Sequence, residues 1–129
     1  MAKTKTKIRT LKANTVMEKW SEAVKVRDGW KCVYCGKKTN LQSHHIFKRQ
    51  HSMTKYMLDN GVTLCSGPGS CHSEIEKNYD MKQWLINWVG REKYDNLDRL
   101  HYQPKQWSKC PSELREVYES LKEFIKQNA

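Results

Sequence analysis

The sequence predicts a small α+β protein in which two short strands and a cysteine-rich turn are flanked by helices on both sides. Three observations lead to this prediction. Apolar residues recur at helical spacing towards both ends of the chain, two short segments in the middle have strand character, and four cysteines stand in two pairs beside them. The 129 residues have the usual length of one domain.

The N-terminal helix is expected over residues 15–28. Val16, Trp20 and Val24 are four residues apart and therefore share one face of a helix. Gly29 follows at the position where helices commonly stop. The apolar face predicts that this helix packs against a core.

The middle of the chain is expected to hold two strands and the start of another helix. Strands are predicted at 41–47 and at 62–64, and the turn-prone pair Asn60-Gly61 opens the second one. A helix is expected to begin near His72 and to run towards Tyr79.

The last third of the chain is predicted to be helical, over residues 80–89, 91–101 and 112–127. Each segment carries apolar residues at helical spacing, as amphipathic packing helices do. These helices are interpreted as a packing scaffold or as an accessory binding surface.

The formal net charge is +10 and the pI is near 9.5, which favours a polyanionic partner. Residues 1–14 carry five basic side chains and no acidic one, and are expected to form a basic flexible tail. Such a tail could follow phosphates or could simply be solvated. It lacks the apolar face of a lipid-binding helix. The chain has neither a membrane-length apolar run nor a secretory signal, so a cytoplasmic location and no membrane partner are expected.

Five cysteines, an odd number in a chain without a secretory signal, argue against a disulfide framework. Cys32 and Cys35 form a C-x2-C pair, and Cys65 and Cys71 a wider C-x5-C pair. Four thiolates can close the tetrahedral site of a structural zinc ion. The alternative is four reduced cysteines in the core. Cys110 has no partner in this pattern.

The histidines provide a second candidate metal site. His44 and His45 lie on a predicted strand, where neighbouring side chains point to opposite faces, so the two cannot have the same role. His72 opens a predicted helix, and Glu76 lies four residues later on the same face. His44, His72 and Glu76 could together hold one divalent ion and leave positions open for water and a phosphate oxygen.

These strings resemble the HNH endonuclease family. The resemblance rests on segments 27–36, 41–46, 60–65 and 71–72 and covers roughly residues 15–80. It implies a ββα-metal core with a zinc knuckle and with DNA as the substrate. The implied division of the chain is a tail at 1–14, a nuclease core at 15–80 and a helical extension packed on the core at 81–129.

The resemblance also implies a role for each site residue. His44 and His72 match the metal ligands, and His45 matches the general base that takes a proton from the attacking water. Asn60 matches the asparagine that ties the loop between the strands and orients the base. Glu76 stands where some members have another histidine ligand. A carboxylate suits Mg²⁺ or Mn²⁺, with Ni²⁺ or Zn²⁺ as the alternatives.

The expected function is metal-dependent hydrolysis of DNA phosphodiester bonds, by nicking or by cutting both strands. The alternative is a zinc-stabilised DNA-binding module without catalysis, which would have no need for His44, His45, Asn60 and His72. Lys48 and Arg49 are expected to contact DNA, unless they belong to a solvated loop. Similarity to stand-alone phage and bacterial members implies a bacterial or phage-infected host cell. The target, the protein partners and the choice between monomer and homodimer stay open.

Overall fold

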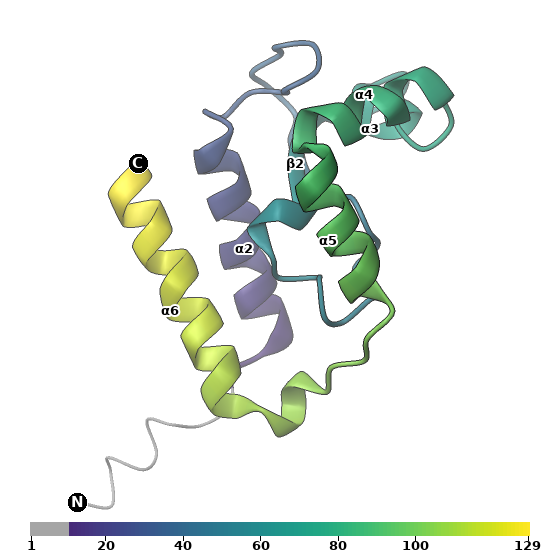
Figure 1. The fold of residues 1–129 in the computed structure, drawn as a ribbon. Helices are drawn as coiled ribbons and strands as arrows, with labels where there is room; N and C mark the ends of the chain where they lie inside the picture. Colours follow the sequence, from purple (N-terminus) through teal and green to yellow (C-terminus); the bar gives the residue numbers. More distant parts are fainter. Residues whose placement is uncertain (1–10) are drawn as a thin grey trace, which may run out of the picture.

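The computed structural model describes residues 11–129. Most of the predicted basic tail, including Lys3, Lys5, Lys7 and Arg9, lies outside the described residues. One β-hairpin lies between an N-terminal helix and a series of C-terminal helices (Figure 1). The elements are α2 (Ala13–Arg27), β1 (Leu41–His45), η1 (Leu58–Asn60), β2 (Gly61–Cys65), α3 (Cys71–Glu74), α4 (Tyr79–Val89), α5 (Arg91–His101), η2 (Trp107–Lys109) and α6 (Pro111–Asn128).

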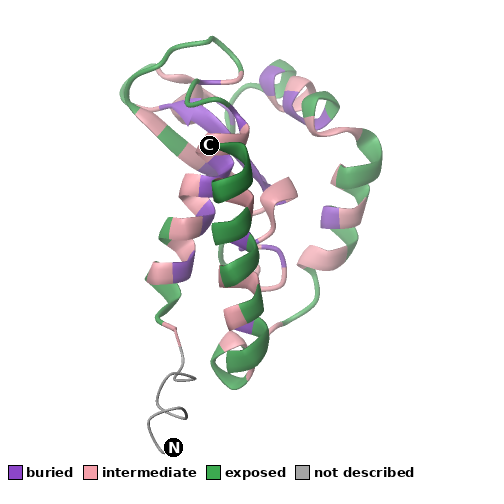
Figure 2. Cartoon of the chain, turned by 90° about the vertical axis from the view of Figure 1, so that its left-hand side faces the viewer, coloured by how far each residue is buried: buried purple, intermediate pink, exposed green. Residues whose placement is uncertain are grey.

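The hairpin pairs β1 with β2 in antiparallel register. Leu41 lies opposite Cys65 and His45 lies opposite Gly61. Every residue of β2 is buried, because α2 packs on the hairpin from one side and α3 contacts β2 as well. Figure 2 shows the buried strand β2 among helices whose outer faces are exposed. The observed architecture confirms the predicted α+β class.

Two apolar clusters hold the fold together. In the first, Val16, Trp20 and Val24 of α2 pack against Leu114 and Leu121 of α6. These two helices are far apart in sequence but lie side by side in Figure 1. The predicted apolar face of the N-terminal helix is therefore core.

The second cluster lies where the hairpin meets α3 and α4. Leu64 of β2, Ile75 just after α3 and Leu85 of α4 have no exposed surface. Cys32 belongs to the same cluster, so the turn that carries the first cysteine pair is anchored in the core. The two clusters fix the hairpin between the N-terminal and C-terminal helices.

Several element boundaries differ from those predicted. The first helix begins at Ala13 and not at residue 15. The first strand stops at His45, two residues early, because the next backbone N–H groups bond to Asn60 and not to the partner strand. The helix expected from His72 to Tyr79 was wrong as a single element. Its first part, α3, already ends at Glu74, and Asn78, whose backbone is extended and whose side chain accepts the Met81 N–H (3.1 Å), caps the start of α4.

In the described part of the chain, no helix combines the length and apolar character needed to cross a membrane.

Candidate functional site

The four cysteines of the two predicted pairs meet in one cluster. Their sulfur atoms all lie within 4.8 Å of one another, and the Sγ atoms of Cys35 and Cys65 are 3.8 Å apart. The donor set and its size fit a tetrahedral zinc ion. The cluster joins the turn before β1 to the end of β2 and to the first residue of α3.

Backbone N–H groups point at these sulfur atoms, as suits a thiolate site. The Cys35 N–H lies 3.5 Å from the Sγ of Cys32, and the Cys71 N–H lies 3.4 Å from the Sγ of Cys65. Burial acts to raise the pKa of Cys32, but hydrogen bonds from backbone N–H groups outweigh it and lower that pKa to about 7. Cys32 can therefore lose its proton near neutral pH, as metal ligation requires.

The wide spacing of the second pair is absorbed by a glycine turn. Gly67 and Gly69 have φ angles of +114° and +70°, which side-chain-bearing residues rarely adopt. The turn is closed by a bond from the Ser70 N–H to the Gly67 carbonyl (3.1 Å). The residues between Cys65 and Cys71 therefore loop out, and α3 begins at Cys71, next to the predicted start near His72.

His44 lies beside the two other predicted ligands of the divalent ion. Its Nε2 is 3.1 Å from a carboxylate oxygen of Glu76, and its ring centroid is 5.2 Å from that of His72. The carboxylate of Glu76 also receives Lys82 of α4, at 3.4 Å from each oxygen. Within residues 11–129, only the four cysteines form a group of three or more candidate ligands whose ligand atoms all lie within 4.8 Å. His44, His72 and Glu76 are thus neighbours, but their ligand atoms do not converge on one point.

The protonation state of His44 suits a metal ligand. Its side chain is almost fully buried, and this burial, opposed by the nearby Glu76 carboxylate, lowers its pKa to about 4. At neutral pH the imidazole therefore carries no charge and keeps a lone pair available.

His45 faces away from His44, as strand alternation predicts, and is held on two sides. Its ring stacks on Trp20 of α2, with centroids 3.9 Å apart and planes inclined by 11°. Its Nε2 lies 3.0 Å from the backbone carbonyl of Lys55. A carbonyl can only accept, so Nε2 carries the hydrogen and Nδ1 keeps the lone pair. Burial lowers the pKa of His45, which also favours the neutral ring.

Asn60 ties together the loop between the strands. Its side-chain oxygen accepts the Phe47 N–H at 2.8 Å, and its amide donates to the carbonyls of Phe47 (2.9 Å) and Thr54 (3.2 Å). The side chain is fully buried, and every polar atom of it is used. Asn60 thus fixes both ends of the loop that carries the Lys55 carbonyl.

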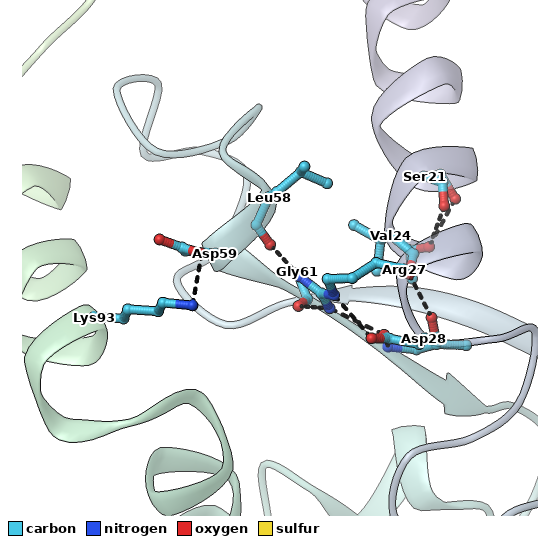
Figure 3. Close-up of polar contacts among 10 residues, drawn as sticks. Ser21, Val24, Arg27, Asp28, Leu58, Asp59, Gly61 and Lys93 are labelled. Atoms are coloured by element: carbon cyan, nitrogen blue, oxygen red, sulfur yellow. Dashed lines mark hydrogen bonds and ion pairs between the residues drawn. The ribbon is translucent and has the colours of Figure 1, made fainter. Parts of the chain in front are cut away.

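A neighbouring contact network was missed by sequence reasoning (Figure 3). Arg27 pairs with the Asp28 carboxylate through two nitrogens (2.8 and 3.0 Å) and donates to the carbonyls of Leu58 and Gly61, both at 2.7 Å. The same carboxylate accepts the Thr63 N–H at 2.9 Å. Arg27 and Asp28 therefore lock the end of α2 to the segment that contains Asn60. The adjacent Arg27 and Asp28 at the end of the helix were the only signal of this network in the sequence. Nothing in the sequence indicates their backbone partners, which are more than 30 residues away.

The histidines open into a surface cavity of about 560 Å³. His44, His45 and His72 all line it, together with Lys48 and Arg49. The predicted site residues His44, His45 and His72 are thus gathered at one cavity, and the two predicted DNA-contacting residues lie at its exposed edge.

This fold and site define a small two-stranded, helix-flanked domain with a four-cysteine metal-type cluster. Residues 32–78 match the family model described as HNH endonuclease. The match covers the cysteine cluster, the hairpin and all five predicted catalytic and divalent-ion residues, but not α2 or the helices after residue 78. Comparisons with curated proteins and with solved structures gave no significant match.

Proposed function

We propose that the protein is a metal-dependent endonuclease that hydrolyses phosphodiester bonds in DNA. The observation that carries this proposal is the placement of His45. Its Nε2–H is bound to the Lys55 carbonyl, so Nδ1 is left as the basic atom of a neutral ring at the cavity beside His44. A neutral imidazole in this state can take a proton from water.

His44, His72 and Glu76 are the residues that would hold the divalent ion. Two imidazoles and a carboxylate form a suitable donor set, and Mg²⁺ or Mn²⁺ would favour the carboxylate. When bound, such an ion stabilises the negative charge that develops on the phosphate and the leaving oxygen. Because Lys82 and His44 share the Glu76 carboxylate, that side chain must change partners for the set to close.

Several residues position the base without touching the reacting atoms. Trp20 covers one face of the His45 ring, and Asn60 holds the loop that supplies the Lys55 carbonyl. The helical extension at 81–129 is proposed to act as scaffold, since α6 packs on the helix that carries Trp20.

The proposal is tested by incubating supercoiled plasmid with the protein and Mg²⁺, Mn²⁺, Ni²⁺ or Zn²⁺ in turn. Wild type should nick or linearise the plasmid with at least one ion, and His45→Ala should lose roughly 10²–10⁴-fold in rate. Lys126→Ala, at an exposed residue of α6 outside this cavity, is the control and should cut like wild type. Plasmid binding without cutting under every ion would favour the non-catalytic DNA-binding module instead.

A further inference from the structure

A second cavity, of about 570 Å³, adjoins the one that holds the histidines. Met17, Lys48 and Arg49 line both cavities and form their shared border. Beyond that border, the second cavity lies between the first turns of α2, at Ala13 and Asn14, and the loop that follows β1. The two hollows therefore form one continuous groove that begins at the histidines.

The Lys and Arg residues that line this groove make its charge positive. Lys25, Lys48 and Arg49 line the first cavity, Lys48, Arg49 and Lys55 line the second, and no acidic residue lines either. Three other cavities, by contrast, each include acidic residues in their walls. Among residues 11–129 no ion pair involves any of these four basic side chains. The groove thus offers unpaired positive charge to a ligand.

We propose that the second cavity binds the sugar-phosphate backbone of the DNA on one side of the bond that is cut. The strand would pass from the histidines over Lys48 and Arg49 to Lys55 and the start of α2. This inference rests on the proposed nuclease function and adds a direction to it. The groove leads towards Ala13 and Asn14 at the N-terminal end of α2, which follows the basic segment of the sequence.

Lys55 is the residue at which the proposal can be isolated. Of the two cavities, Lys55 lines only the second, and its contact with His45 is made by its backbone carbonyl. Removing the ammonium group therefore takes away a phosphate contact and leaves the base in place. Lys55→Gln removes the charge at similar length, and Lys55→Arg restores it. Lys126→Ala, in a cavity lined by Glu119 and Glu123, removes the same charge elsewhere.

The experiment measures the Kd of a short fluorescent DNA duplex by anisotropy, over a salt series and without added divalent ions. Each phosphate contact makes the slope of log K against log salt more negative by about 0.9. The loss of one contact should therefore weaken binding by about 8-fold at about 0.1 M salt. Lys55→Gln should lose about this slope and affinity, Lys55→Arg should recover most of it, and Lys126→Ala should retain the wild-type slope.

Equal slopes for Lys55→Gln and Lys126→Ala would overturn the groove proposal, because net charge alone would then explain the binding. The assay needs no cleavage, so the two proposals fail separately. If the duplex binds as predicted but no ion supports plasmid cutting, the nuclease proposal fails and the groove stands.

Discussion

Gly61 is the position where a single added methyl group should disturb both the fold and the site. It lies opposite His45 in the hairpin, and its backbone is ordinary extended structure, with φ −122° and ψ 151°. A Cβ there would lie 2.5 Å from Cγ2 of Val24 and 2.7 Å from Cζ2 of Trp20. Both neighbours are fully buried core residues, so Gly61→Ala acts by steric overlap and not by backbone strain.

The expected cost can be worked from this overlap. Forcing an extra methyl group into a packed core destabilises proteins by about 1–3 kcal/mol. For a domain of this size each kcal/mol lowers Tm by roughly 4 °C, so Gly61→Ala should melt roughly 4–12 °C below wild type. Val24→Ala removes the closest neighbour. In the double variant the two costs should therefore not add, with a favourable coupling of about 0.5–3 kcal/mol.

The assay is thermal and urea unfolding of wild type, both single variants and the double variant, followed by cleavage kinetics well below the lowest Tm. Because Trp20 stacks on His45, its displacement should lower kcat, while the Kd for DNA without divalent ions should hold. Val24→Ala is destabilised without overpacking against Trp20 and serves as the kinetic control. An unchanged Tm for Gly61→Ala, or strictly additive costs in the cycle, would refute the reasoning.

The remaining predictions concern the loop, the cysteine cluster and His44. Asn60→Ala leaves the part-buried N–H and carbonyl of Phe47 without their partner, at about 1–3 kcal/mol for each, while the Thr54 carbonyl keeps the Met57 N–H, and should lower both the free energy of unfolding and kcat. Cys32→Ser should reduce the bound zinc from about one ion per chain and lower Tm, as elemental analysis and calorimetry would show. The pKa of His44 is lowered from 6.5 to about 4 by burial, so the unfolded chain binds more protons across that interval. Without added divalent ions, stability should therefore be full above about pH 6.5 and fall towards pH 4, less steeply in His44→Gln.

Much of this fold was predictable because the signals are local. Helical spacing placed Val16, Trp20 and Val24 on one buried face, and the two cysteine pairs predicted a cluster that the structure shows. The boundaries that failed depend on partners distant in sequence. The first strand ends where Asn60 takes over its hydrogen bonds, which the spacing of residues 41–47 cannot reveal.

The candidate site could be predicted only in part, for the same physical reason. The resemblance to the HNH family implied that His44, His45 and His72 belong to one site, and they line one cavity. The stack of Trp20 on His45 could not be predicted, because it joins a helix to a strand across an intervening turn. The sequence pattern indicates only that Trp20 is a core residue. The assignment of His44, His72 and Glu76 to one ion stays a prediction, because ligand closure depends on the ion itself.

The central claim is that His45 acts as the base of a metal-dependent nuclease. The most direct measurement is the single-turnover cleavage rate of a DNA duplex as a function of pH, for wild type and His45→Ala, with the most active ion. We predict that the wild-type rate rises with pH to a plateau as the base loses its proton, and that His45→Ala is slower by roughly 10²–10⁴-fold without that dependence. Equal rates and equal pH profiles for the two proteins would contradict the account.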